Sequence, residues 1–216
     1  MIKAENIHKQ YGEVEVLKGV DFQVDQGEIV SIVGASGAGK TTLLQILGTI
    51  EKPSQGNVWS NDVDLFALSD KKIASYRNKN VGFIFQFHQL LPEFTAVENV
   101  MLPALIKGES KKQAHNRAMD LLGYLQLDHM ANKKPDTLSG GEQQRVAVAR
   151  ALTNKPEVVL ADEPSGNLDS KNALELHQLF IKLRDEYKQS FVIVTHNEQL
   201  ADLSDRKLTM RDGLLL

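Results

Sequence analysis

The stretch IVSIVGASGAGKTTLL, residues 29–44, decides the fold that the sequence predicts. Its first part, Ile29–Gly34, is almost wholly apolar, as is typical of a strand that is covered on both faces. Glycines at 34, 37 and 39 follow, and Thr41–Leu47 then carries leucine and isoleucine at helical spacing. A buried strand, a flexible loop and a helix in this order predict an α/β fold.

The loop itself has the pattern G-x-x-x-x-G-K-[ST], from Gly34 to Thr41. Between a strand and a helix, this pattern indicates a phosphate-binding loop. Glycines let successive backbone N–H groups converge on one point, and the helix N-terminus adds partial positive charge. We expect Lys40 to neutralise the terminal phosphate oxygens of a nucleotide and the Thr41 hydroxyl to bind Mg²⁺. The alternative, a glycine-rich turn with an incidental lysine, is disfavoured by the flanking strand and helix.

A second apolar run, in VVLADEP, ends in two acidic residues. Four apolar residues from Val158 predict a buried strand that ends at Asp162, where a carboxylate can hold Mg²⁺. Glu163 follows with a side chain that we expect to be free to orient an attacking water molecule. The alternative is a solvated strand end without catalytic meaning, which the phosphate loop makes the weaker interpretation.

Composition limits the class of protein. The chain has 216 residues, 42% of them hydrophobic, and a net charge of −3, so no overall positive field attracts nucleic acid or anionic lipid. It contains no cysteine, which excludes disulfides, thiolate catalysis and cysteine-bound metals. Its first residues, MIKAENIHKQ, do not resemble a signal peptide, and no stretch approaches the roughly 18 apolar residues of a spanning helix. We therefore expect a protein of the cytoplasmic type.

The organisation along the chain changes twice. Short strands are predicted at Ile2–Ile7 and Val16–Val24, in a more exposed antiparallel layer. Amphipathic helical patterns fill about Pro92 to Leu152, without a strand. Strand and helix patterns then alternate again. We expect one domain, 1–216, in which about 1–88 and 156–216 form an α/β core and about 89–155 form an inserted helical lobe.

The stretch LSGGEQQRVAVARAL, residues 138–152, resembles the signature motif of ATP-binding cassette (ABC) ATPases. Ser139, Gly140 and Gly141 precede a helix, so they form a second candidate phosphate-binding helix N-terminus. The resemblance implies a P-loop NTPase fold of the ABC type: a RecA-like core, an antiparallel β lobe and an inserted α-helical subdomain. It also implies a head-to-tail homodimer, in which the signature loop of one subunit closes on the nucleotide that is bound by the other.

The resemblance extends to further positions. Tyr11 occupies the place of an aromatic that stacks on adenine, and Gln86 that of a glutamine that reaches Mg²⁺ and water. SGNLD, residues 165–169, resembles the loop that touches the partner subunit, and His196 resembles the switch histidine that contacts the γ-phosphate. The resemblance thus implies ATP and Mg²⁺ as cofactors and an active hydrolase. The implied catalytic residues are Glu163, His196, Lys40 and Gln86; the ATP contacts are Tyr11, Gly34, Ala35, Ser36, Gly37, Ala38, Gly39, Lys40, Thr41, Thr42, Ser139, Gly140, Gly141 and Asp169; the metal ligands are Thr41, Gln86 and Asp162.

The family resemblance also implies partners and a location. A chain without its own membrane span would serve a transporter by docking on separate permease subunits, near Gln86 and the helical lobe, at the cytoplasmic face of the bacterial inner membrane. Membrane contact would then come through partners only, and no nucleic acid would bind. Soluble ATPases of the family that act on ribosomes or DNA are the alternative of a different class. They usually have two cassettes or long coiled-coil arms, whereas Gln86 and Ser139 here are separated by room for only a few helices.

Within the family, FQFHQLLPEFTAVENVMLPALI, residues 85–106, closely resembles the ATPases that release lipoproteins from the inner membrane. His88, Pro92 and Phe94 carry much of this narrower match, and plain packing in the lobe is an equally good reading of them. ATPases of macrolide or peptide exporters and of the cell-division complex share much of the same motif context. The cargo and the membrane partner therefore stay open at this point.

Overall fold

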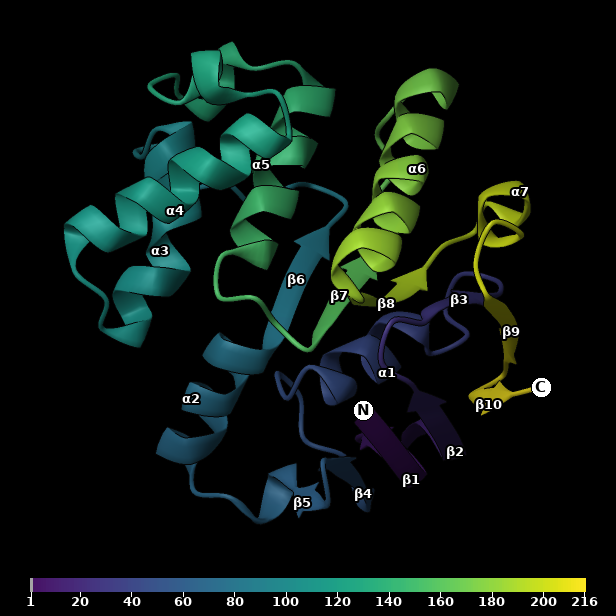
Figure 1. Cartoon of the computed structure of the whole chain (residues 1–216). Coiled ribbons are helices and arrows are strands. Elements are labelled where there is room, and N and C mark those ends of the chain that lie inside the picture. The colour runs from purple at the N-terminus through teal and green to yellow at the C-terminus, as the bar shows by residue number, and fades with distance from the viewer. Residues whose placement is uncertain (1) are drawn as a thin grey trace.

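The computed structural model describes residues 2–216 of the chain, which form two sheets with helices between and around them (Figure 1). The larger sheet has six strands in the order β10-β9-β3-β8-β7-β6. Its strands pair in parallel except for β10, which pairs antiparallel with β9. The strands of this sheet are β3 (Ile29–Val33), β6 (Val81–Phe85), β7 (Val158–Asp162), β8 (Ser190–Val194), β9 (Arg206–Arg211) and β10 (Leu214–Leu215).

The smaller sheet is antiparallel and has the order β2-β1-β4-β5. Its long strands β1 and β2 alternate between buried and more exposed residues along much of their length, as expected for a sheet with one covered face. The predicted antiparallel layer at the N-terminus is thereby confirmed. Its strands are β1 (Ile2–Tyr11), β2 (Val14–Val24), β4 (Gln55–Ser60) and β5 (Val63–Asp64).

The central strands of the larger sheet send alternate side chains into two separate cores. In β8, Val192 and Val194 join the core that contains the apolar residues of α1, whereas Phe191 and Ile193 join the core that contains those of α5 and α6. Every residue of β8 is therefore buried, which explains why residues 191–194 after Ser190 are all apolar. The helices named here are α1 (Lys40–Leu47), α5 (Gly140–Leu152) and α6 (Ser170–Tyr187).

A helical lobe follows β6 and packs against α6 and one face of the larger sheet (Figure 1). Its helices α3 (Ala96–Lys107), α4 (Lys111–Tyr124) and α5 each begin with a capping box, in which a Ser or Thr and the residue three positions later bond each other's backbone N–H. The prediction of helices without a strand between Pro92 and Leu152 is confirmed. The remaining helical segments are α2 (Asp70–Asn80), α7 (Glu198–Ala201) and the short 3₁₀ turns Leu65–Ala67, Asp128–Met130 and Pro135–Thr137.

Several predicted bounds are corrected by the structure. The strand predicted at Ile2–Ile7 continues to Tyr11, and that predicted at Val16–Val24 begins at Val14. The helix predicted from Thr41 begins one residue earlier, at Lys40. No helix in residues 2–216 has both the length and the apolar character to cross a bilayer.

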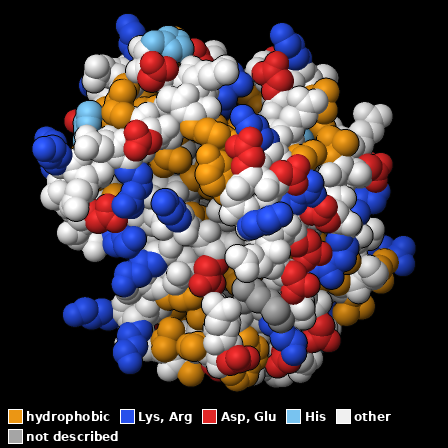
Figure 2. All heavy atoms as spheres, in the orientation of Figure 1, with side chains coloured by type: hydrophobic (Ala, Val, Ile, Leu, Met, Phe, Trp, Pro, Cys, Tyr) orange, Lys and Arg blue, Asp and Glu red, His pale blue; other side chains and the backbone are white. Residues whose placement is uncertain are grey.

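Charge is unevenly spread over the surface. Figure 2 shows lysine and arginine side chains gathered along the edge formed by α2, α3 and α4, with many acidic side chains on the opposite side of the same face. Although the net charge of the chain is −3, this edge of the surface is locally basic. The lysines of these three helices are Lys71, Lys72, Lys79, Lys107, Lys111 and Lys112.

Candidate functional site

The parallel strands bring the predicted site residues to one edge of the larger sheet. Asp162, the last residue of β7, is paired with Phe85 on one side and with Val194 on the other. The segments that begin at Gly34, Gln86, Glu163 and Thr195 therefore leave the sheet at its carboxyl edge, where open α/β sheets bind their ligands.

The phosphate loop presents backbone to solvent and keeps its lysine folded inward. Gly37 and Gly39 have left-handed φ angles of 80° and 106°, which favour glycine, and Gly39 is the N-cap of α1. Lys40 is only 8% exposed, and its Nζ donates to the carbonyls of Gly34 and Ala35 at 2.8 and 2.9 Å. Ala35, Ser36 and Gly37 are exposed. The first N–H groups of α1 and the Lys40 ammonium thus offer an anion a ready site.

The hairpin of β9 and β10 packs against the phosphate loop. A Cβ on Gly34 would lie 2.1 Å from the carbonyl oxygen of Met210, so only glycine lets the loop and β9 approach so closely. Nearby, the N–H of Gly213 donates to the carbonyl of Ala38 at 3.1 Å. The hairpin of β9 and β10 therefore helps to fix the position of the phosphate loop.

Asp162 and Thr41 form the next contact. The Thr41 hydroxyl donates to Asp162 Oδ1 at 3.1 Å, so two of the residues predicted as metal ligands lie next to each other. Burial raises the pKa of Asp162, and the nearby Glu163 adds to this, while Thr41 and Lys40 act in the opposite direction. Such a carboxylate gains from a cation, because the cation restores the solvation that burial removes.

Glu163 is held in an uncommon backbone conformation. Its φ is 47°, in the left-handed region, and its N–H donates to the carbonyl of Val194 at 2.8 Å. Its carboxylate Oε2 lies 2.9 Å from Nδ1 of His196 and accepts the His196 backbone N–H at 3.3 Å. The expectation that this side chain is free is therefore corrected, because it is bound to the other predicted catalytic residue. Strain of this kind in a non-glycine residue is typical of functional sites.

Gln86 is paired with a residue that sequence reasoning did not single out. Its Nε2 donates to Oδ1 of Asn167 at 3.3 Å, and Nδ2 of Asn167 donates to the Gln86 carbonyl at 2.9 Å. A Cβ on Gly166 would lie 2.8 Å from Gln86 Nε2, so a larger residue at position 166 would clash with the glutamine side chain. Asn167 lies in the SGNLD segment, but its pairing with Gln86 is not visible in the sequence.

The residues of LSGGE cap their own helix. Ser139 bonds reciprocally with Glu142, and these hydrogen bonds hold the pKa of the Glu142 carboxyl below its usual range. Gly141 faces Asn172, because its Cβ would lie 3.0 Å from Asn172 Oδ1. The start of α5 lies at the top of the view in Figure 1, well separated from α1. The structure therefore does not bring Ser139, Gly140 and Gly141 together with the phosphate loop of the same chain.

Three predicted ATP contacts remain, namely Tyr11, Thr42 and Asp169. Tyr11, at the end of β1, is 46% exposed, and Nζ of Lys9 lies 4.8 Å from the centroid of its ring. Asp169 is the N-cap of α6 and accepts the N–H groups of Lys171 and Asn172, both at 3.0 Å. Thr42, in the first turn of α1, is half-buried.

The buried strand β3 is followed by a glycine-rich loop with an inward lysine, and an aspartate ends β7 of the same sheet. This combination defines a P-loop nucleotide-binding protein. The comparisons with known proteins narrow this class. The family model of the ABC transporter matches residues 17–166. The chain belongs to the ABC transporter family.

Relatives of the chain match it over its whole length. A protein of Cytophaga hutchinsonii is 62% identical over 216 residues, which cover 100% of this chain and 99% of that protein. A protein of Bacteroides thetaiotaomicron is 58% identical, with 100% and 99% covered. Both are named lipoprotein-releasing system ATP-binding protein LolD.

Solved structures confirm the predicted fold class. The dimeric structure of MJ0796, described as a bacterial ABC transporter cassette, is 41% identical with a TM-score of 0.91 and covers 100% of this chain and 96% of its own. A dimeric post-hydrolysis state of the same cassette, bound to ADP and Pi, is 40% identical with a TM-score of 0.90 and the same shares covered. The chain is thus an ABC ATPase, which hydrolyses ATP coupled to transport.

Proposed function

We propose that this chain is the ATP-binding and ATP-hydrolysing subunit of a bacterial transporter that releases lipoproteins from the inner membrane for delivery to the outer membrane. The observation that carries the proposal is the full-length similarity, at 62% and 58% identity, to proteins that are named for lipoprotein release. The close pairs Thr41–Asp162 and Glu163–His196 beside the phosphate loop support an active hydrolase.

The residues at the sheet edge fit ATP with Mg²⁺. Residues 2–216 contain no group of three or more His, Cys, Asp or Glu side chains that could hold a metal by themselves. A cation here would therefore depend on nucleotide oxygens together with Thr41, Asp162 and Gln86. When bound, Mg²⁺ would neutralise charge on the phosphate oxygens. The exposed phosphate loop would bind the triphosphate, and the exposed Tyr11 ring would offer a surface for adenine.

Lys40 would change partners during the reaction, whereas Glu163 would keep its contact with His196. Lys40 would leave the carbonyls of Gly34 and Ala35 for phosphate oxygens, which are stronger acceptors because they are charged. Glu163 would accept a proton from the attacking water, while His196 holds its carboxylate and approaches the γ-phosphate. The left-handed backbone at Glu163 aims this carboxylate toward His196.

A second copy of the chain would complete the site. Ser139, Gly140 and Gly141 lie away from the phosphate loop of their own chain, yet they begin a helix whose N-terminus can bind phosphate (Figure 1). A head-to-tail homodimer would bring the signature residues of one copy onto the ATP of the other, with Asp169 beside the interface. The dimeric structures of MJ0796 support this arrangement.

The membrane subunits would dock on exposed apolar side chains that follow Gln86. Phe87 is 75% exposed, Leu91 42%, Phe94 37% and Ile106 73%. Side chains of this size are exposed together mainly at interaction surfaces. The chain would therefore sit at the cytoplasmic face of the inner membrane, as a peripheral subunit that touches the membrane through its partners.

The proposal treats 1–216 as a single domain, with about 1–88 and 156–216 as the catalytic core and about 89–155 as the lobe. The common packing of α3, α4 and α5 supports this division. A transporter of macrolides or peptides, or a cell-division complex, would use the same ATPase chemistry with other membrane partners. An ATPase that acts on ribosomes or DNA is the candidate of a different class, and the basic edge in Figure 2 is the feature that would suit it.

Co-purification tests these functions directly. The Glu163→Gln variant is expressed in the native host, solubilised from membranes with ATP present, and its partners are identified by mass spectrometry. We expect lipoprotein-releasing membrane subunits. An exporter permease or a cell-division protein would overturn the proposed cargo. A soluble pool bound to ribosomes or DNA would overturn the transport function.

A further inference from the structure

Arg150, in the last turn of α5, forms hydrogen bonds with the backbone that follows Gln86. Arg150 donates from Nη2 to the carbonyl of His88 at 2.8 Å and from Nη1 to the carbonyl of Gln89 at 2.6 Å. Arg150 is partly buried, and burial lowers the pKa of its guanidinium. The two carbonyls therefore replace much of the water that would otherwise solvate this cation.

The turn 88–89 that Arg150 binds has a strained backbone. His88 and Gln89 have φ angles of 55° and 49°, both in the left-handed region that non-glycine residues seldom adopt. Within the turn, the N–H of His88 donates to the carbonyl of Phe85 at 3.1 Å, and that of Gln89 donates to the carbonyl of Phe87. Outside a tight hairpin turn, two such residues in a row are strained and persist where the surroundings hold them. Arg150 supplies the two side-chain hydrogen bonds that do so.

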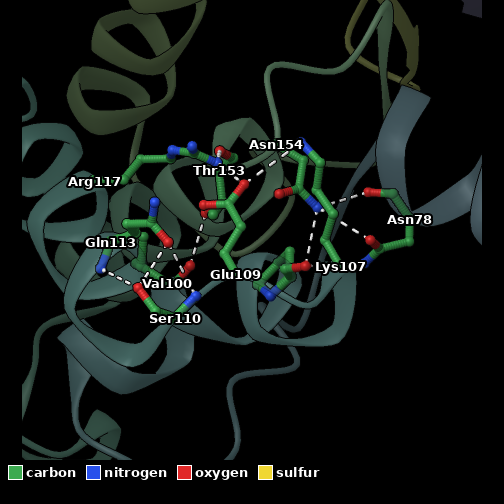
Figure 3. Close-up of polar contacts among 10 residues, drawn as sticks. Asn78, Val100, Lys107, Glu109, Ser110, Gln113, Arg117, Thr153 and Asn154 are labelled. Atoms are coloured by element: carbon green, nitrogen blue, oxygen red, sulfur yellow. Dashed lines mark hydrogen bonds and ion pairs between the residues drawn. The ribbon is translucent and has the colours of Figure 1, made fainter.

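The end of α5 is itself anchored, on the side shown in Figure 3. Oγ1 of Thr153 donates to the carbonyl of Val100 in α3 at 2.7 Å. Nδ2 of Asn154 donates to the carbonyl of Asn78 in α2 at 2.8 Å and to that of Pro103 at 3.0 Å. Both side chains are buried. Arg150 in α5 and the two residues after its end therefore connect α2, α3 and the segment after Gln86.

We infer that Arg150 is a positioning residue that acts through Gln86. Only Phe87 separates Gln86 from the turn 88–89 that Arg150 binds, so a movement of α5 displaces the backbone that carries Gln86. A shift of α5, the helix that begins with the signature residues, would thereby change the position of Gln86 through Arg150. The inference rests on the proposed function, because it assigns Arg150 to the reaction of that same site.

Steady-state ATP hydrolysis by the purified chain tests the inference, with kcat and KM measured separately. Arg150→Ala is compared with Arg150→Lys, which keeps a cation, and with Arg117→Ala as the matched control. Arg117 also donates to a backbone carbonyl near the end of α5, that of Thr153 at 3.3 Å, and it pairs with Glu109 at 2.9 Å rather than with the turn (Figure 3). Circular dichroism confirms that each variant is folded.

The expected result is a selective loss of turnover. For Arg150→Ala we expect kcat to fall roughly 10- to 100-fold with KM changed less than about threefold, since misplaced groups cost rate more than binding. Arg150→Lys recovers part of this loss, and Arg117→Ala stays within about twofold of wild type. In a Gln86→Ala background, Arg150→Ala lowers kcat by less than about threefold further, because residues that act as one unit are not additive.

Three results would overturn the inference. They are an unchanged kcat in Arg150→Ala, an equal loss in Arg117→Ala, and a full additional loss in the Gln86→Ala background. If Arg150→Ala does not fold, Arg150→Lys and the Gln86→Ala cycle built on it decide in the same way. Absence of turnover in the wild-type chain is a different outcome, which overturns the proposed function and this inference with it.

Discussion

Glu163 and His196 face each other from the ends of β7 and β8, with Nδ1 of the histidine 2.9 Å from Oε2 of the glutamate. The glutamate side chain is 18% exposed and the histidine 70% exposed, so the pair opens to solvent on the histidine side. A nucleotide on the phosphate loop would meet this pair from the open side.

Glu163→Gln keeps the size of the side chain and removes its ability to accept a proton. We expect the variant to bind ATP like wild type and to hydrolyse it roughly 10²- to 10⁴-fold more slowly, the usual contribution of a positioned general base. Single-turnover hydrolysis and binding of a fluorescent ATP analogue measure the two quantities. Glu198→Gln, at an exposed glutamate that pairs with Lys207, is the control. Turnover near wild type in Glu163→Gln would rule out this role for Glu163.

Asp162 makes the stability of the nucleotide-free protein depend on pH. Burial raises its pKa above the ordinary 3.8, so its contribution to the free energy of unfolding is full below pH 3.8 and is lost as the pH rises through the higher pKa of the folded state. The side chain at position 162 of the Asp162→Asn variant cannot ionise, so the variant does not lose this stabilisation as the pH rises. We expect its melting temperature, relative to wild type, to rise between pH 4 and pH 7, by about 2–4 °C per kcal/mol. A relative fall over this range would contradict the assigned shift, and Mg²⁺-dependent ATP binding should weaken in the same variant.

Gly34 and Gly123 form a matched pair of glycines. A Cβ on Gly34 would lie 2.1 Å from the backbone oxygen of Met210, whereas one on Gly123, inside α4, would meet nothing within 4 Å. We expect Gly34→Ala to lower the free energy of unfolding by about 1–3 kcal/mol, as overpacking does. Gly123→Ala should raise it by about 0.5–1 kcal/mol. Urea unfolding measures both, and equal effects would show that the loop does not depend on the close approach to β9.

Asn99 organises the segment that carries the exposed apolar residues. Its fully buried side chain accepts the N–H of Leu91 at 2.8 Å and donates to the carbonyls of Leu91, Phe94 and Thr95, each at 3.1 Å. Asn99→Ala leaves these groups without the partner and should cost about 2 kcal/mol or more. Asn116→Ala, at an exposed position of α4, should stay within about 0.5 kcal/mol of wild type. A cost at Asn99 as small as at Asn116 would contradict this role.

The sequence predicted the parts of the fold in which one local pattern decides. β3, β7 and β8 are covered on both faces and are therefore mostly apolar, with Ser31, Asp162 and Ser190 as their polar residues. By contrast, α2 contains no buried residue, so no apolar stripe marks it in the sequence. β10 has two residues and owes its place to pairing with β9, which no local pattern reveals.

The same division holds for the site. The phosphate loop could be predicted because its residues are consecutive and each has a physical role at its position. The contacts of Asn167 with Gln86, of Met210 with Gly34 and of Arg150 with His88 join residues from 62 to 176 positions apart. Such pairings depend on the packing of the lobe against the sheet. Only the folded chain reveals them.

The most direct test of the account measures the mass of the Glu163→Gln chain in solution with and without ATP, by size-exclusion chromatography with light scattering. If the signature residues of one copy close on the phosphate loop of another, ATP converts this variant from a monomer to a dimer. Ser139→Arg, which places a bulky side chain at the start of α5, should prevent the conversion while each chain still binds ATP. A variant that binds ATP and stays monomeric at all concentrations would contradict the shared site.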